Sequence, residues 1–203
     1  MEFFSFDLVS FIKATGVLGV AAIIFIESGL LVGFFLPGDS LLFTAGFLAS
    51  QHVIPLIPLL VFSFAGAVLG DNLGYAIGKR LGPRLFTKNE SFFFRRDHVE
   101  KTKAYFDRYG PKTILLARFI PVVRTFAPVM AGVGAMRYRT FVAYNLAGGF
   151  LWSVCLPILG YALGSTIPDV DRYLIPIIIA IILASVLPPL REYWRYSGIK
   201  RSS

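Results

Sequence analysis

Five ionisable side chains lie within or beside long apolar stretches of the sequence, and they are the residues best suited to do chemistry. The acids Glu27, Asp39 and Asp71 fall in the first half of the chain, whereas Arg118 and Arg124 fall in the second. A charge at membrane depth costs at least ~2.5 kcal/mol, so such a group generally faces protein or water and has a partner. We therefore predict that acids and arginines pair between the two halves.

The two arginines have a specific chemical use. Two guanidinium groups near helix ends can hold a phosphate through forked, charge-assisted hydrogen bonds. A helix that begins after Pro121 would add its N-terminal dipole. Carboxylates held in the same region could take up and release a proton during transport. A structural alternative stays open, in which these charges are buried salt bridges that pin two segments together, and the two interpretations are compatible.

Other reactive residues form no recognisable site. His52, His98 and Cys155 are far apart in the sequence, so neither a metal site nor a cofactor is expected. The chain has no His-Glu-x-x-His, no Gly-x-Ser-x-Gly and no Walker or dinucleotide loop. No histidine nucleophile lies near the arginines, so we predict no catalytic residues and do not expect an enzyme such as a lipid phosphatase.

Composition places these charges in a membrane protein. Of 203 residues, 56% are hydrophobic and 16% are charged, and the mean hydropathy is +0.69. Long apolar runs indicate a bilayer as solvent. The net charge of +8 does not predict a nucleic-acid partner, because the basic residues lie between apolar segments, as in cytoplasmic loops. The first residues lack a basic cluster and a small-residue cleavage site, so a removable signal peptide is not expected.

The apolar stretches predict the elements that must position the charges. A spanning helix needs about 20 apolar residues, and residues 54–78, 140–164 and 173–190 meet that length. The stretch 15–50 is interrupted by Glu27 and by Pro37, Gly38 and Asp39. The stretch 113–136 carries Arg118, Pro121, Arg124 and Pro128. The broken stretches are where the five charges gather.

The distribution of basic residues predicts the topology. The loop 79–112 holds ten Lys/Arg and four Asp/Glu, and the tail 191–203 is also basic. The positive-inside rule places both in the cytoplasm. That is consistent only if 113–136 enters and leaves the membrane by the same side, as a re-entrant hairpin. Residues 92–109 are expected to form an interfacial helix.

An internal repeat extends this prediction to the first half. Three short motifs recur in order 84–86 residues later: Phe35-Leu36-Pro37 as Phe119-Ile120-Pro121, Ala45-Gly46 as Ala131-Gly132, and Gly74-Tyr75-Ala76-Ile77-Gly78 as Gly160-Tyr161-Ala162-Leu163-Gly164. The copies would cross the membrane in opposite directions, an architecture typical of transporters. We predict an all-α integral membrane protein, an inverted repeat with two opposed re-entrant helical hairpins plus spanning helices.

The expected organisation is a single membrane domain, 1–203. It comprises repeat one at about 27–78, the cytoplasmic interfacial segment 79–112, repeat two at about 113–164, the final span 173–190 and the basic tail 191–203. Whether residues 15–35 span fully or form one arm of a hairpin stays open, and so does the side of the N-terminus.

Several of these motifs resemble the DedA family, also called SNARE-associated or VTT-domain proteins. The resemblance covers about residues 20–165. It implies a bacterial inner-membrane protein with two opposed re-entrant hairpins that moves polyprenyl phosphate or phospholipid across the membrane, in some members with the proton gradient. The family's functional acids fall on Glu27 and Asp39, and its arginine pair on Arg118 and Arg124. The residues that carry the resemblance are Glu27, the run 35–42 (FLPGDSLL), the run 70–78 (GDNLGYAIG), the run 118–124 (RFIPVVR), Ala131, Gly132, Met136, Phe141, Asn145 and Trp152.

The predicted function is translocation of a lipid with an anionic phosphate headgroup across the inner membrane, with a cytoplasmic C-terminus. Arg118 and Arg124 would bind the substrate, and Glu27, Asp39 and Asp71 would serve proton coupling or the substrate pathway. The alternative is a proton-coupled small-ion antiporter that supports envelope homeostasis. The sequence leaves a homo-oligomer open.

Overall fold

The structure, a computed structural model, describes residues 8–30, 37–85, 110 and 112–166. Within them the secondary structure is entirely helical, which confirms the all-α prediction for this part of the chain. The predicted interfacial helix 92–109, the final span 173–190 and the basic tail 191–203 lie outside the described residues. The helices are α1 (Leu8–Gly29), α2 (Gly38–Ser50), α3 (Leu56–Leu85), α5 (Lys112–Ala117), α6 (Pro121–Val133) and α7 (Tyr138–Thr166).

Three of these helices are long and apolar enough to cross a membrane. They comprise Val9–Gly29, Leu56–Arg80 and Tyr138–Thr166. Their outer faces expose large apolar side chains that water would not favour and lipid would. The chain is therefore a membrane protein with several candidate spans. The most exposed of these side chains on α1, α3 and α7 are Leu18, Ile57, Val61, Leu69, Phe150 and Leu159.

The remaining helices, α2, α5 and α6, are shorter. The breaks before α2 and α6 lie at Pro37 and Pro121, as the sequence predicts, whereas the break inside α1 was not predicted. Gly16 interrupts α1 with a φ of 62°, so the segment that follows, 17–29, is about as long as α2 and α6, which have 13 residues each. At 1.5 Å per residue, such a segment measures about 20 Å, less than the ~30 Å hydrocarbon core. Pro37 precedes α2. Pro121 begins α6 after an extended Ile120, since proline suits the first helical turn.

The ends of α2 and α6 share one backbone geometry. Each helix finishes in a Schellman motif, in which the second residue beyond the C-cap bonds a carbonyl five residues back. The amide of Val53 donates to the carbonyl of Leu48 at 3.1 Å, and that of Met136 to Ala131 at 3.0 Å. The left-handed position is filled by a non-glycine residue both times, His52 (φ 59°) and Ala135 (φ 56°). The two halves of the chain therefore repeat in backbone geometry as well as in sequence.

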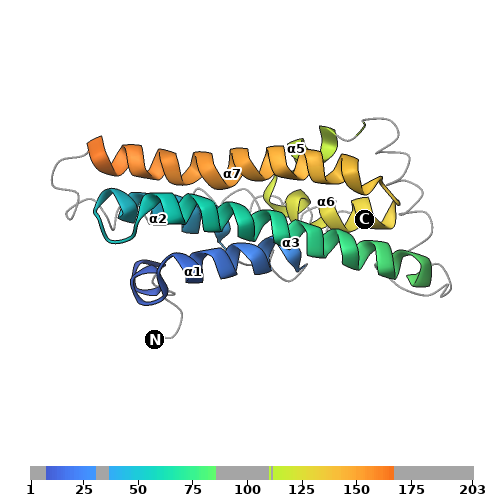
Figure 1. Ribbon diagram of the computed structural model, residues 1–203, viewed down its shortest axis with the longest axis horizontal. Coiled ribbons are helices and arrows are strands. Elements are labelled where there is room, and N and C mark those ends of the chain that lie inside the picture. The colour runs from blue at the N-terminus through green and yellow to red at the C-terminus, as the bar shows by residue number, and fades with distance from the viewer. Residues whose placement is uncertain (1–7, 31–36, 86–109, 111, 167–203) are drawn as a thin grey trace, which may run out of the picture.

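The halves are interlocked. In Figure 1, α3 and α7 lie side by side and run in opposite directions, with α1 and α2 toward the end where α3 begins and α6 toward the end where α7 begins. The short helix of each half packs on the long helix of the other, α2 on α7 and α6 on α3.

Glycines permit these close contacts. A Cβ at Gly160 would collide with the backbone of Phe43, and a Cβ at Gly78 with the backbone of Val129. Small residues are the usual means of close helix packing in membranes. Phe43 and Val129 are themselves related by the 86-residue offset of the repeat.

Candidate functional site

The first ion-pair cluster forms around Arg124, in the first half of α6. Its two terminal nitrogens contact different acids, Glu27 near the end of α1 and Asp39 in the first turn of α2. Asp39 is suited to that position, because an acid near a helix N-terminus is favoured by the dipole. The Glu27 side chain is 2% exposed, whereas that of Asp39 is 32% exposed. The cluster is thus sealed on one side and open on the other.

The contact between Glu27 and the beginning of α2 depends on Gly38, which has no side chain. A Cβ at Gly38 would collide with the carboxylate of Glu27. Glycine at the beginning of α2 therefore lets the Glu27 carboxylate lie against the helix end. In the sequence Pro37-Gly38-Asp39, Pro37 precedes the helix and Gly38 leaves space for the Glu27 carboxylate. Asp39 supplies the second acid.

The second cluster forms around Arg118, which directly follows α5. One terminal nitrogen pairs with Asp71 of α3 at 2.6 Å, and the other donates to the side-chain oxygen of Asn145 on α7 at 3.0 Å. Arg118 and Asp71 are each 5% exposed. This cluster therefore joins α3, α5 and α7 in a closed, polar contact with one carboxylate for one guanidinium.

Trp152 of α7 links the two clusters. Its indole N–H donates to the Asp39 carboxylate at 2.6 Å. The guanidinium carbon of Arg124 lies 4.5 Å from the centre of the indole ring, and that of Arg118 lies 5.7 Å from it. Both distances fall within the range of cation–π attraction. One aromatic side chain therefore contacts both arginines and one of the acids.

A single face of α7 receives Arg118. Asn145, Gly148, Gly149 and Trp152 recur at helical spacing, so they share that face. A Cβ at Gly149 would lie 3.1 Å from an Arg118 nitrogen, so the glycine provides space for the guanidinium. From the sequence, Asn145 and Trp152 were named only among the residues that carry the family resemblance and not among the site residues. The signal that identifies them is the glycine pair between two polar-tipped residues, three to four residues apart.

The five charges singled out in the sequence are brought together, and acids pair with arginines between the halves as predicted. Three carboxylates face two guanidinium groups, so the fully ionised site has a formal charge of −1. One further positive charge, either a proton or a cation, would make the site neutral. Within residues 8–30, 37–85, 110 and 112–166, no group of three His, Cys, Asp or Glu residues could hold a metal ion.

Comparison with known proteins places this chain in a family. The VTT domain matches residues 36–162, a range that holds both arginines, Asp39, Asp71 and Trp152, while Glu27 precedes it. Protein DedA of Escherichia coli (strain K12) is 46% identical over 176 residues, which is 86% of this chain and 80% of that protein.

Two further relatives are described as membrane proteins. An uncharacterized membrane protein of Mycobacterium tuberculosis (strain ATCC 25618 / H37Rv) is 45% identical over 91% of this chain and 82% of its own length. The inner membrane protein YghB of Escherichia coli (strain K12) is 39% identical over 75% of this chain and 69% of its own length. No solved structure matches the chain. The domain match and these identities together show that the chain belongs to the DedA family of VTT-domain membrane proteins.

Proposed function

We propose that this protein moves a lipid with an anionic phosphate headgroup, such as a polyprenyl phosphate or a phospholipid, across the membrane. The observation that carries the proposal is that Arg124 is held by two carboxylates, one of them in contact with the surroundings. A guanidinium that already binds two oxygens of carboxylates has the fork geometry that also fits two oxygens of a phosphate. Arg124 would bind the headgroup by exchanging carboxylate for phosphate.

The helix lengths support a re-entrant arrangement. Segment 17–29 with α2 forms one pair of short helices, and α5 with α6 forms another. Each of these four segments is shorter than the hydrocarbon core, although α1 counted across the break at Gly16, from Val9 to Gly29, has the length of a span. We propose that each pair enters and leaves by one side, and that the broken tips meet at depth where their charges satisfy one another. The headgroup would then bind between the two tips.

Proton uptake would control the exchange. With both acids ionised, Arg124 (+1) faces Glu27 and Asp39 (−2), so a phosphate is repelled. Protonation of the two acids leaves the arginine charge unbalanced and available to the anion. Loss of the protons restores the carboxylates and expels the phosphate. Proton movement and lipid movement would thereby be coupled through one side chain.

Arg118 would have a supporting part in binding. It keeps its pairing with Asp71 and Asn145, and its charge faces the same indole as Arg124. In this proposal Arg118 holds the break between α5 and α6 in place, close to Arg124, and adds positive potential near the headgroup. Asp71 belongs to the pathway as the partner that keeps Arg118 in place.

The orientation follows from the basic residues. Lys79 and Arg80 in the last turns of α3 and Arg137 and Arg139 at the beginning of α7 lie toward the same end of the molecule (Figure 1). The positive-inside rule favours the cytoplasm for that end. We propose an inner-membrane location with this end and the C-terminus in the cytoplasm.

Reconstituted vesicles test the proposal. Purified protein in liposomes, with a labelled phospholipid or polyprenyl phosphate and an imposed pH gradient, should transfer lipid between leaflets at least tenfold faster than the Arg124→Ala variant. Arg137→Ala, which removes the same charge from an exposed position, is the matched control and should keep wild-type flux. Wild-type flux no greater than that of Arg124→Ala would overturn the proposal. Glu27→Gln with Asp39→Asn should abolish the dependence of the flux on the pH gradient.

A second candidate is a proton-coupled small-ion antiporter, and the excess of carboxylates over arginines favours it. A site with a charge of −1 attracts a monovalent cation in exchange for a proton. Cation flux that depends on a pH gradient supports this candidate if the labelled-lipid assay detects no transfer between leaflets.

A further inference from the structure

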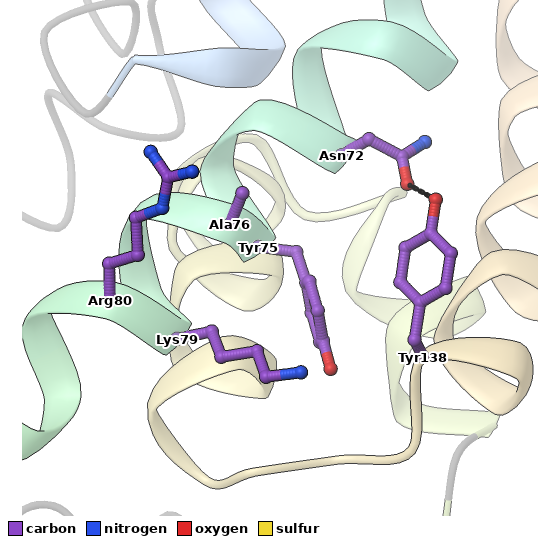
Figure 2. Close-up of a pocket in the computed structure, with 6 residues that line it drawn as sticks. All are labelled: Asn72, Tyr75, Ala76, Lys79, Arg80 and Tyr138. Carbon is purple, nitrogen blue, oxygen red and sulfur yellow. Dashed lines mark hydrogen bonds between the residues drawn. The ribbon is translucent and has the colours of Figure 1, made fainter.

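A pocket of about 580 Å³ lies away from the ion-pair clusters, at the end of the molecule that carries Lys79 and Arg80. Three successive turns of α3 form one wall, and the beginning of α7 forms the other (Figure 2). Its volume falls within the range of small-molecule sites. We propose that this pocket is a second binding site for the phosphate group of a lipid, where the headgroup is held before or after it reaches Arg124. It is lined by Asn72, Tyr75, Ala76, Lys79, Arg80 and Tyr138.

The charges of the lining favour an anion. Lys79 and Arg80 are its only ionic groups, and none of the six lining residues is an acid. Among the described residues, neither cation has an ion-pair partner. In Figure 2 the Lys79 side chain extends toward the end of the Tyr75 ring, whereas the Arg80 guanidinium points away from both. Lys79 is therefore the cation placed to bind a phosphate, as a point charge with three N–H donors.

The aromatic walls are held in place. The Tyr75 hydroxyl donates to the carbonyl of Met136 at 2.6 Å, and its ring stacks on Phe141 at 4.6 Å between centroids. Gly132 of α6 packs so closely on this part of α3 that a Cβ would collide with the carbonyl of Tyr75. Tyr138 is 53% exposed, so its hydroxyl can turn from the protein to a ligand. The pocket thus has one rigid wall and one adjustable donor.

Hydrogen bonds connect the pocket to the buried Arg118 cluster. The Tyr138 hydroxyl donates to the side-chain oxygen of Asn72 at 3.0 Å. The side-chain amides of Asn72 and Asn145 both donate to one acceptor, the carbonyl of Val68, at 2.7 and 3.2 Å. Asn145 in turn accepts the bond from Arg118. A phosphate that accepts the hydrogen bond of the Tyr138 hydroxyl frees the Asn72 oxygen, which is the first link of this path toward Asn145.

The depth and the surroundings of the pocket favour a lipid phosphate over a free phosphate. Lys79 lies at the end of the apolar segment Leu56–Arg80, the level at which lipid headgroups meet a spanning helix. Deeper on α3, Leu69 and Leu73 are exposed and offer an apolar surface for an acyl chain. The proposal rests on the proposed function for its ligand class, but binding can be measured without transport.

Binding to purified protein in detergent tests the pocket. The measurements use the Arg124→Ala background, because that variant lacks the headgroup site proposed above. Dioctanoyl phosphatidic acid is titrated with microscale thermophoresis as readout, next to inorganic phosphate and dioctanoylglycerol, which has no phosphate. We expect phosphatidic acid to bind and Lys79→Ala to weaken it about tenfold, the effect of losing one charge-assisted contact. Arg139→Ala removes an exposed charge near the same end, outside the pocket, and should change the affinity less than twofold.

Each outcome bears on the pocket. Inorganic phosphate that binds as tightly as phosphatidic acid identifies free phosphate as the ligand of the same cationic site. Equal affinities of Lys79→Ala and Arg139→Ala, or binding of dioctanoylglycerol as tight as that of phosphatidic acid, would overturn the proposal. Tyr138→Phe, which keeps the ring, should weaken binding two- to fivefold and guards against misfolding of the lysine variant. If vesicles of the wild type move no lipid while Lys79-dependent binding persists, the proposed function fails and the pocket stands.

Discussion

The same residue type occupies two different electrostatic settings on the two sides of the break between α5 and α6. Arg118 has one carboxylate partner and one amide partner, and all three side chains are buried. Arg124 has two carboxylate partners, one of which is about a third exposed. A balanced, closed pair is costly to disturb and stays as it is. An acid-rich, open pair can change its charge and its partner, so the difference separates a structural lock from an exchangeable site.

The lock predicts the largest effect. Arg118→Ala leaves the Asp71 carboxylate buried without its partner, and breaking a buried pair in this way costs ~3–5 kcal/mol. The free energy of unfolding in detergent, followed by tryptophan fluorescence, should fall by that amount. Asp71→Asn in the same chain should restore most of the loss, because it removes the unpaired charge. A loss below ~1 kcal/mol for Arg118→Ala would show that Arg118 does not lock α3, α5 and α7 together.

The exchangeable site predicts a smaller loss of stability with a larger loss of function. Arg124→Ala removes hydrogen bonds to two charged groups, but Asp39 can turn to its exposed side, and the buried Glu27 carboxylate can bind a proton and become neutral. We expect the free energy of unfolding to fall by about 2 kcal/mol, less than for Arg118→Ala, while lipid flux is lost. Arg124→Lys keeps the charge without the fork and should recover stability more than flux. Equal losses of stability in the two alanine variants would remove the distinction between the clusters.

The sequence predicted that acids and arginines meet, but not the partner of each arginine. Acids in one half, arginines in the other and prolines at the breaks predict that charged tips meet, because unpaired charges are costly in a membrane. The sequence did not predict which acid meets which arginine. Asp71 of α3 pairs with Arg118 because α7 packs on both α3 and α5, and that arrangement is a property of the whole fold. The re-entrant path of the tips stays a prediction.

The contribution of α7 to the site could not be predicted from the sequence either. Asn145 and Trp152 are ordinary residues for a spanning helix, and only the position of Arg118 against that face reveals their use. Gly148 and Gly149 acquire meaning in the same way, since a glycine pair in a membrane helix more often serves helix packing. The spacing in the sequence does show that all four residues share one face of the helix.

Trp152 contacts both clusters, so changing its parts separately sharpens the comparison with the smallest expected effect. Trp152→Phe keeps an aromatic ring near both guanidinium groups but removes the N–H that donates to Asp39. One hydrogen bond to a charged group is lost, and we expect the free energy of unfolding to fall by about 1–2 kcal/mol. The Arg118 cluster should be unaffected, because the indole N–H does not contact it.

The control is Trp152→Ala, which removes the ring as well and should cost ~3–5 kcal/mol through the cavity that it leaves. Combining each change with Arg124→Ala separates the clusters. If the N–H acts only through Asp39 and Arg124, Trp152→Phe should have almost no effect in the Arg124→Ala background, whereas Trp152→Ala should still destabilise the protein through Arg118 and the core. Equal effects of Trp152→Phe in both backgrounds would mean that Asp39 and Arg124 are not coupled, and the open cluster would then not act as one unit.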